Sequence, residues 1–254
     1  MLSIEQRHRY IIDQMNKKGF IRVQEVADAL GVTGATIRKD LRILESQHVL
    51  HRNHGSASPV KQKVIDLPIH EKSSIRAGEK KRIAQAAARL VGEDDSVILT
   101  SGTTIEALAL ALKPKGTLNA VTPSIRVGVL LSEKENVEVM MLGGRIIKKS
   151  FSVRDTYTME GLKNVSCSKL FFSCDGFDLD AGIMCATEDE ARMTSSMIDA
   201  VPEAILLADS SKLGKLGFGK ICPIERVHVL VTDKGLSDDV RQRFEEAGVR
   251  VILA

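Results

Sequence analysis

Apolar positions in residues 1–50 recur at helical spacing and predict three short helices. The first helix begins near Ser3, which with Gln6 has the spacing of a capping box, and it ends at Gly19. Its expected apolar stripe consists of Ile4, Ile11, Ile12 and Met15. A short extended piece, residues 20–23, follows. The pattern therefore predicts a small, mostly helical module at the start of the chain.

The second and third helices are joined by a glycine turn. Residues 24–30 form the expected second helix. Its inward positions are Val26, Ala27 and Leu30. The dipeptide Gly31-Val32 then turns the chain, and Thr33 has the chemistry of an N-cap for the third helix. Two short helices joined through a glycine turn are typical of a helix-turn-helix.

The third helix, TGATIRKDLRILES, has the two faces of a DNA recognition helix. Its core face consists of Ile37, Leu41 and Leu44. The small residues at its start let the helix N-terminus approach base edges, and the long cations on the outer face reach phosphates. The expected DNA-binding residues are Thr33, Gly34, Ala35, Thr36, Arg38, Lys39 and Arg42. The alternative is an ordinary amphipathic helix with a solvated face.

The stretch VLHRNHGSA after this helix has the pattern of a β-wing. From such a wing His51, Arg52 and His54 would contact the DNA backbone or the minor groove. The alternative is that the histidines simply face solvent. We therefore expect a winged helix-turn-helix in residues 1–56.

The residues after the wing have the character of a linker. Residues 57–76 show little apolar periodicity and contain Pro59 and Pro68, which indicates a segment lying along the surface. A helical pattern resumes at Ala77. Its apolar face consists of Ile83, Ala87 and Leu90. The expected division is a DNA-binding domain over 1–56, a linker over 57–76 and a larger domain over 77–254.

The larger domain alternates apolar, strand-like runs with helical patterns. The runs are SVILT, LNAVT, VEVMML, KLFFS, AILLA and VHVLVT. Each is followed by a polar turn and most by a helix, which argues for a parallel α/β sheet. Because ligands of open α/β sheets bind beyond the carboxyl ends of the strands, the residues just after each run are candidate binding residues.

These candidates suit a ligand that carries a phosphate and hydroxyl groups. The turn SGTT offers hydroxyls and backbone N–H groups at a helix start, although alone such a turn is more often a plain N-cap. It consists of Ser101, Gly102, Thr103 and Thr104. Arg145 and Lys212 can neutralise phosphate charge or be ordinary surface cations. Asp175 and Asp178 can accept hydrogen bonds from sugar hydroxyls, whereas Asp-Gly is otherwise a common turn.

Composition and charge narrow the class of protein. The chain has 254 residues and 43% hydrophobic content, enough for two domains. Residues 1–63 hold 11 Lys and Arg against 6 Asp and Glu, whereas the remainder holds 25 against 27. A basic module ahead of an acidic one favours a polyanion partner for the former, although a modest excess of Lys is often just a solvated surface.

Other sequence features argue against a membrane or secreted protein. No apolar run approaches the roughly 20 residues of a membrane span, and the start MLSIEQRHRY is too charged for a secretory signal. The four cysteines lack Cys-x-x-Cys spacing and do not cluster with histidines. They are Cys167, Cys174, Cys185 and Cys222. We expect a cytoplasmic protein with reduced, separately buried thiols, no disulfide, no metal site and no membrane partner.

The stretch GVTGATIRKDLRILESQHVLHRNHGSA resembles the N-terminal signature of the DeoR-type transcriptional repressors, and residues 97–235 resemble their sensor domain. The resemblance implies a winged helix-turn-helix that binds double-stranded operator DNA, followed by a Rossmann-like α/β domain similar in fold to ribose-5-phosphate isomerase. It further implies that a phosphorylated sugar or related metabolite, bound by the second domain, controls a carbohydrate-metabolism operon. The family also works as homo-oligomers, so a dimer or tetramer is expected.

The motifs that carry the resemblance are SGTT, T-x-S, LGG, DG and ADSSK. The implied effector-binding residues are Ser101, Gly102, Thr103, Thr104, Thr122, Ser124, Gly143, Gly144, Arg145, Asp175, Gly176, Asp178, Glu188 and Lys212. We expect Lys212 to be the first charge partner of the phosphate and Arg145 the second. The sequence departs from the family pattern at Thr100, Pro123, Ser173, Cys174 and Arg154. Because Arg154 stands where a small residue is common, the sugar-contacting side is expected to differ.

The alternative from another class is an enzyme, a sugar-phosphate isomerase with a fused regulatory module. Isomerisation needs an acid and a base around the carbonyl, and carboxylates occur at Glu188, Asp189 and Glu190. However, the sequence DLDAGIMCATEDEA stands where the resembled isomerase has a glycine-rich lysine loop. No Ser/His/Asp arrangement, HExxH or Walker loop occurs. We therefore expect a regulator without a cofactor rather than an enzyme.

Overall fold

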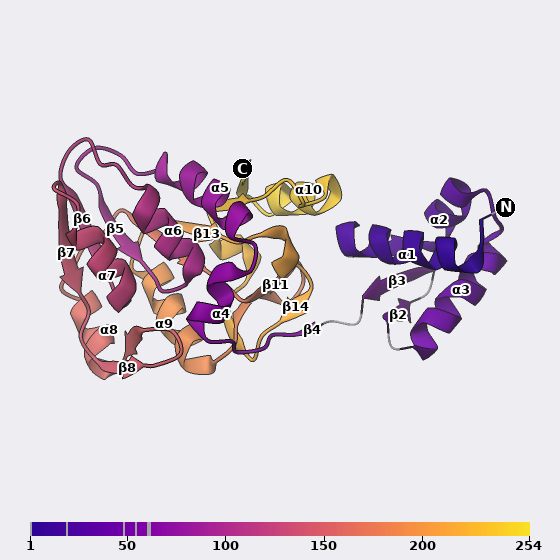
Figure 1. Ribbon diagram of the computed structural model, residues 1–254, viewed down its shortest axis with the longest axis horizontal. Helices are drawn as coiled ribbons and strands as arrows, with labels where there is room; N and C mark the ends of the chain where they lie inside the picture. Colours follow the sequence, from indigo (N-terminus) through magenta and orange to yellow (C-terminus); the bar gives the residue numbers. More distant parts are fainter. Residues whose placement is uncertain (1, 19, 48, 54, 60–61) are drawn as a thin grey trace. The chain divides into compact units, whose positions relative to one another are not determined.

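The computed structural model describes residues 2–18, 20–47, 49–53, 55–59 and 62–254 (Figure 1). The chain forms two compact units, which are described separately. The N-terminal unit comprises Met1–Gln62 and Leu236–Arg241, and the larger unit comprises Lys63–Gly235 and Gln242–Ala254. The segment expected as a linker, 57–76, contains a short helix, α4 (Ile69–Ser74), that belongs to the larger unit.

The N-terminal unit is a winged helix-turn-helix. Its elements are α1 (Ile4–Lys18), β1 (Ile21–Arg22), α2 (Val23–Leu30), α3 (Gly34–Ser46), β2 (Leu50–Asn53) and β3 (Ser56–Pro59). The strands form an antiparallel sheet in the order β1-β3-β2. The predicted capping box is confirmed, because the backbone N–H of Gln6 donates to Ser3 Oγ and that of Ser3 to Gln6 Oε1. Gly31 turns the chain in the left-handed region, at φ 62°.

The core of this unit follows the predicted stripes with one exception. Among its fully buried side chains are Ile11, Met15, Ile37, Leu41 and Leu44. Ile4, expected in the stripe of the first helix, is 55% exposed. It lies in the first turn of α1, one turn before the helix reaches the buried core, so the prediction is wrong at this position.

A buried ion pair joins the first and third helices. Arg7 Nε and Nη2 donate to the two carboxylate oxygens of Asp40 at 2.7 and 2.9 Å, a bidentate arrangement. The His8 ring nitrogen lies 3.4 Å from the same carboxylate. The hydrogen bond and the negative charge of Asp40 raise the pKa of the Arg7 guanidinium despite its burial. The pair therefore holds the inner face of α3 against α1.

The larger unit is an α/β domain whose strands come from the predicted runs. Its helices are α4, α5 (Ala77–Ala88), α6 (Thr103–Ala111), α7 (Ile125–Ser132), α8 (Thr156–Leu162) and α9 (Glu188–Asp199), and α10 (Asp238–Glu246) lies near the end of the chain. The strands of its main sheet are β5 (Ser96–Leu99), β6 (Leu118–Thr122), β7 (Val137–Met141), β10 (Lys169–Ser173), β13 (Glu203–Leu207), β16 (Val229–Thr232) and β17 (Arg250–Leu253).

These strands are parallel, in the order β17-β16-β13-β10-β5-β6-β7. The prediction of a parallel α/β sheet from six apolar runs is confirmed, and β17 is an additional strand. Smaller antiparallel pieces were not expected. They are β8 (Arg145–Ile147) with β9 (Ser152–Arg154), and β11 (Gly176–Asp178), β12 (Gly182–Cys185) and β15 (Gly219–Cys222). The short strands β4 (Gln62–Lys63) and β14 (Lys215–Leu216) complete the described set.

Helices cover both faces of the main sheet. In Figure 1, α5, α6 and α7 lie next to one another, and their apolar residues pack on one face of the strands. The alternate residues of the same strands, such as Ile98, Phe172 and Leu206, are equally buried, so the second face is covered as well. From β5 the strand order runs outward through β6 and β7, and the chain then returns to β10 on the other side of β5. The topological switch point therefore lies between β5 and β10, where open α/β sheets bind ligands.

We expect Asp40→Asn to destabilise the N-terminal unit by about 3 kcal/mol, because it leaves the buried Arg7 guanidinium without its carboxylate. Urea unfolding of the full chain, followed by a probe in α3, measures the loss. The matched control is Asp28→Asn on the exposed face of α2, which removes an equal charge and should cost less than about 0.5 kcal/mol. Equal stability of the two variants would contradict a structural role for the Arg7–Asp40 pair.

Candidate functional site

A cavity of about 90 Å³ lies at the carboxyl ends of β5, β10 and β13, within the larger unit. Its lining comprises Asp66, Leu67, Ile69, Lys72, Lys80, Ser101, Gly102, Thr103, Thr104, Ile147, Lys149, Ser150, Arg154, Ser173, Cys174, Asp175, Thr187, Glu190 and Lys212. Of the effector-binding residues predicted from the sequence, the structure brings six to this cavity. They are Ser101, Gly102, Thr103, Thr104, Asp175 and Lys212. The cavity coincides with the switch point of the sheet.

The SGTT turn presents the N-terminus of α6 to the cavity. Gly102 is the N-cap residue, with φ 124°, and it has no side chain with which to cap the helix. An added Cβ at Gly102 would stand 2.6 Å from Ser173 Oγ, so a glycine is needed for the close approach of this turn to the end of β10. Because no side chain satisfies its first turn, the positive end of α6 is available to an anion.

Two lysines of the cavity have no carboxylate partner. Neither Lys80 nor Lys212 forms an ion pair with any of the described residues, whereas the other three cations of the lining do. Lys80 is buried on α5, and its ammonium donates to the backbone oxygen of Lys72. Burial, followed by the positive charge of Lys212, lowers the pKa of Lys80 to about 8. The cavity therefore contains unbalanced positive charge.

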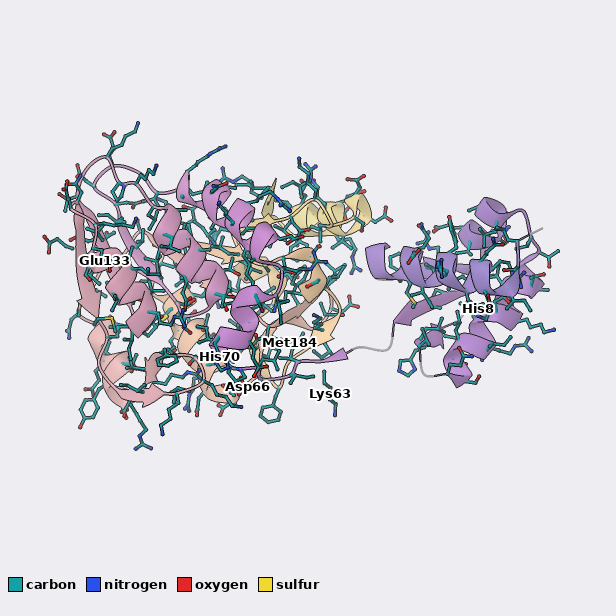
Figure 2. All side chains as sticks on the ribbon, in the orientation of Figure 1. His8, Lys63, Asp66, His70, Glu133 and Met184 are labelled. Carbon is teal, nitrogen blue, oxygen red and sulfur yellow. The ribbon has the colours of Figure 1, made fainter. Side chains whose placement is uncertain are left out.

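The other charges of the cavity are paired. Lys72 on α4 donates to Asp175 Oδ1 at 2.7 Å, and the second oxygen of Asp175 accepts from the backbone N–H of Ala186 at 3.1 Å. Burial opposes the charge of Lys72, but the Asp175 carboxylate more than offsets this and raises the pKa of Lys72. Lys149 donates to Asp66 Oδ2 at 2.8 Å. Figure 2 labels Asp66 on the segment that leads into α4 and His70 in α4 itself.

A second ion pair comes from β9 and α9. Arg154 Nη2 lies 3.3 Å from Glu190 Oε2 and 3.3 Å from Ser150 Oγ, and Nη1 donates to Thr187 Oγ1 at 3.0 Å. The Arg154 side chain is 12% exposed. Burial, opposed in part by the charge of Arg154, raises the pKa of the Glu190 carboxyl. The cationic and acidic side chains here therefore neutralise each other.

The structure does not bring the predicted Gly143, Gly144 and Arg145 to the cavity. They follow β7, which is the edge strand and lies two positions from β5, a separation of roughly 10 Å. Arg145 is exposed on β8. The glycine turn has a packing role, because Thr158 Oγ1 donates to the Gly143 carbonyl at 2.6 Å and would stand 2.6 Å from a Cβ added at Gly144.

Thr122 and Ser124 also lie outside the cavity lining. Both are fully buried. Ser124 Oγ accepts from the backbone N–H of Val127 at 3.3 Å, and Thr122 Oγ1 accepts from the backbone N–H of Ser124 at 3.1 Å. These hydroxyl groups are therefore used to begin α7.

The remaining predicted residues, Gly176, Asp178 and Glu188, do not line the cavity. Asp178 Oδ1 accepts from the backbone N–H of Ala181 at 2.9 Å and shapes the turn between β11 and β12. A Cβ at Gly176 would stand 2.2 Å from the Lys215 carbonyl oxygen. Glu188 is exposed in the first turn of α9, and Glu190 lines the cavity instead because residues two apart face different sides of a helix.

The sequence analysis did not find Lys72 and Lys80, because it considered only residues that follow strands. These lysines lie on α4 and α5, which precede the first strand of the main sheet. A different signal was available for Lys80. It lies three, four and seven residues before Ile83, Ala84 and Ala87, so it is a lysine on the apolar face of its helix. Such a position is typical of a buried cation with a specific partner.

The N-terminal unit presents a basic helix face. Thr33 is confirmed as the N-cap of α3, since its hydroxyl oxygen accepts from the backbone N–H of Thr36 at 3.2 Å. Ala35 and the cations of the outer face are exposed, whereas Gly34 and Thr36 are half-buried. The exposed cations are Arg38, Lys39 and Arg42. The small residues at the N-terminus of α3 and its long cationic side chains are therefore accessible on the same face of the helix.

The wing adds one cation, Arg52, which already forms an ion pair with Glu45 on α3. Arg52 Nε donates to Glu45 Oε2 at 2.6 Å, and its backbone N–H donates to Glu45 Oε1 at 3.1 Å. These hydrogen bonds lower the pKa of Glu45. His51 is exposed, and His54 lies outside the described residues. Arg52 thus ties the wing to α3.

Three further observations bear on the class of protein. Within the described ranges, no helix is long and apolar enough to cross a membrane. The four cysteines are buried and unbridged. Among the same residues, no group of His, Cys, Asp and Glu side chains has the makings of a metal site.

A winged helix-turn-helix followed by an α/β unit with a polar cavity defines a transcription regulator with a separate sensor domain. Residues 7–63 match the family model of the DeoR-like helix-turn-helix domain, and residues 75–234 match that of the DeoR C terminal sensor domain. The chain belongs to the DeoR family of transcriptional regulators.

The relatives match nearly the whole chain. The uncharacterized HTH-type transcriptional regulator YulB of Bacillus subtilis is 36% identical over 98% of this chain and 96% of that protein. The HTH-type transcriptional regulator GlpR of Haloferax volcanii is 31% identical over 99% and 98%. The lactose phosphotransferase system repressor of Streptococcus mutans is 37% identical over 90% and 92%. These relatives are named as regulators, not as enzymes.

Among solved structures, ribose 5 phosphate isomerase A from Neisseria gonorrhoeae is similar to part of the chain. The TM-score is 0.38 and the identity is 21%, and the match spans 53% of this chain and 52% of that one. The match therefore spans only about half of either chain.

We expect Gly102→Ala to destabilise the larger unit by about 1–3 kcal/mol, because an alanine is strained at φ 124° and its Cβ would clash with Ser173 Oγ. Thermal unfolding of the full chain measures the change. Gly143→Ala is the matched control, since nothing lies within 4 Å of a Cβ added there. A Gly102→Ala protein as stable as this control would show that the turn does not need its glycine.

Proposed function

We propose that this protein is a repressor of a carbohydrate-metabolism operon whose operator binding is controlled by a phosphorylated sugar or related metabolite. The DNA-binding domain, residues 1–56, binds double-stranded operator DNA. The cavity of the larger unit binds the effector. The name of the Streptococcus relative, a lactose phosphotransferase system repressor, supports the assignment to carbohydrate metabolism.

The observation that carries the effector assignment is the unpaired charge of Lys80 and Lys212 at the cavity that receives the N-terminus of α6. The lining contains five cations and three carboxylates, and each carboxylate is paired with one cation. Two positive charges therefore remain. A phosphate monoester carries a charge of about −1.5 to −2 at neutral pH, which matches this excess. The helix dipole of α6 adds to the attraction.

The SGTT turn supplies the hydrogen-bond donors for such a phosphate. Thr103 and Thr104 line the cavity at the first two positions of α6, where their hydroxyls and backbone N–H groups can donate to phosphate oxygens. Lys80 and Lys212 then act as point charges. This arrangement binds a phosphate through hydrogen bonds and charge, as a sensor requires.

The position of the cavity wall provides a route from effector to DNA. A ligand changes DNA affinity only through its different affinities for two states of the protein. Asp66, Leu67, Ile69 and Lys72 line the cavity, and they belong to the segment that directly follows the N-terminal unit. Occupation of the cavity acts on this segment through Lys72. We also propose a homo-oligomer, because two linked DNA-binding modules gain effective concentration on an operator.

The first test is the pH dependence of inorganic phosphate binding. A bound dianion raises the pKa of Lys80 from its free value of about 8. Below about pH 8 the ammonium is already formed, so the affinity for the phosphate dianion is full. Above it, binding must take up a proton, and this affinity falls by up to about ten-fold per pH unit until the raised pKa is reached. Calorimetry between about pH 7 and 9.5 in buffers of different ionisation enthalpy measures both the affinity and the proton uptake.

Variants of the lysines complete this test. Lys212→Ala should weaken phosphate binding by about ten-fold or more while leaving DNA affinity without ligand unchanged. Lys80→Met should remove the alkaline loss of affinity. The control is Lys220→Met, an exposed lysine on β15 that does not line the cavity. Unaltered binding in both cavity variants would place the phosphate site elsewhere.

The second test concerns DNA. Because Lys39 is exposed on the outer face of α3, Lys39→Ala should weaken binding to all sequences about equally and reduce the slope of log affinity against log salt by about 1. Fluorescence anisotropy over a salt series measures the slope. Arg89→Ala removes an equal charge from an exposed position of the larger unit and should change neither quantity. An effect of Arg89→Ala as large as that of Lys39→Ala would contradict the assignment of DNA binding to the N-terminal unit.

A further inference from the structure

A second group of charges in the cavity is distinct from the phosphate cluster formed by Lys80, Lys212 and the SGTT turn. The charges that act on Glu190 are those of Arg154, Asp175, Lys72 and Asp66. The charges that act on Lys80 are those of Lys212, Asp209, Lys72 and Glu106. Lys72 is the shared member. Both groups line the same cavity, and the Lys80 ammonium donates to the Lys72 carbonyl, so a ligand held by its phosphate at the first group can extend past Lys72 to the second.

The second group is already neutral without a ligand. The Nη groups of Arg154 are used by Glu190, Ser150 and Thr187, and the Lys72 ammonium is used by Asp175. Each cation of this group is already paired with a carboxylate, and only the buried Nε of Arg154 lacks an acceptor. This contrasts with the phosphate cluster, where two positive charges lack partners.

The free hydrogen-bonding capacity of this group suits hydroxyls. Glu190 uses one carboxylate oxygen for Arg154, and the other oxygen can accept from a ligand. Thr187 Oγ1 accepts from Arg154 and from the backbone N–H of Glu190, which leaves its hydroxyl hydrogen to donate. A ligand hydroxyl both donates and accepts, whereas a carboxylate or phosphate only accepts. A second anion would also lie close to the charges of Glu190 and Asp175.

We propose that the Arg154–Glu190 pair reads the hydroxyl groups of the effector and selects ligands whose phosphate is their only anionic group. The proposal rests on the proposed function, since it takes the phosphate cluster as the anchor. Arg154 and Glu190 are specificity-determining residues in this assignment. Arg154 positions the Glu190 carboxylate, which accepts from hydroxyls, and because each cation of this group is already paired, a second anion finds no free positive charge beside the two carboxylates.

Two pairs of probes that differ at a single carbon test this selectivity on the full chain. Glycerol 3-phosphate is compared with 3-phosphoglycerate, and sorbitol 6-phosphate with 6-phosphogluconate; in each pair an alcohol is replaced by a carboxylate. Calorimetry of the wild-type protein should show at least one polyol phosphate binding about ten-fold or more tighter than both its matched acid and inorganic phosphate. Equal binding of alcohol and acid in both pairs, or polyol phosphates no tighter than inorganic phosphate, overturns the proposal.

Two variants then assign the selectivity to the pair. Glu190→Gln keeps the shape of the side chain and removes its charge, so the preference for alcohol over acid should fall to about three-fold or less. Arg154→Met removes the cation that lowers the pKa of the Glu190 carboxyl, so the preference should rise only above the pH at which that carboxyl ionises. Inorganic phosphate affinity should stay within about two-fold in both variants, because the phosphate cluster is intact. An unchanged preference in Glu190→Gln overturns the proposal.

Inorganic phosphate separates this failure from that of the proposed function. If phosphate and all four phosphorylated probes fail to bind the wild-type protein, the phosphate cluster is misassigned and both proposals fall. If phosphate binds and weakens in Lys212→Ala, but alcohols and acids bind alike, only the role of Arg154 and Glu190 is overturned.

Discussion

The candidate ligand site of the larger unit depends on an excess of positive charge in its cavity. Lys80 and Lys212 line the cavity, and neither forms an ion pair with a carboxylate of the described residues. Placing an ammonium group away from water without a carboxylate is unfavourable, and two such groups in one cavity repel each other. The lowered pKa of Lys80 reflects this cost, because burial is its largest cause and the charge of Lys212 the next. The sheet provides the setting, because the turns after β5, β10 and β13 meet at adjacent strand ends. An anion bound here, as we propose, would relieve the repulsion and give the ligand-bound state an energetic advantage.

The rest of the cavity shows the opposite arrangement. Every carboxylate of the lining is matched with one cation, and the matches join elements far apart in sequence, such as α4 with the turn after β10 and β9 with α9. Charges are paired in the same way in the N-terminal unit, where Asp40 forms an ion pair with Arg7 and Glu45 with Arg52. Against this background of matched charges, Lys80 and Lys212 are exceptions, since buried charges in proteins are otherwise paired, and this is why we propose that they bind the effector.

The sequence was most informative where a single physical rule controls the structure. The capping box at Ser3, the cap at Thr33 and the apolar runs of the sheet depend on neighbours close in sequence, so they could be predicted. The rule of strand ends found the SGTT turn, Asp175 and Lys212 because their strands lie side by side. It could not exclude Arg145, since strand order is a tertiary property and β7 lies at the edge. It could not find Lys72 or Lys80, because helices that precede the sheet deliver them. The prediction named Glu188, but Glu190 lines the cavity, because residues two apart on α9 face different sides of the helix.

The contribution of α4 to the cavity limits how this chain can be rearranged. Lys72 reaches Asp175, Ile69 donates its backbone N–H to the Lys149 carbonyl at 2.8 Å, and Val64 donates to the Leu216 carbonyl at 2.9 Å. These contacts tie residues 64–72 to defined positions, so an insertion or deletion among them would move Lys72 out of register with its partner. In evolution, and in the construction of chimaeras, a different DNA-binding module can therefore be joined only upstream of residue 63. The residues between there and α5 must be inherited together with the cavity, as part of the ligand-binding module.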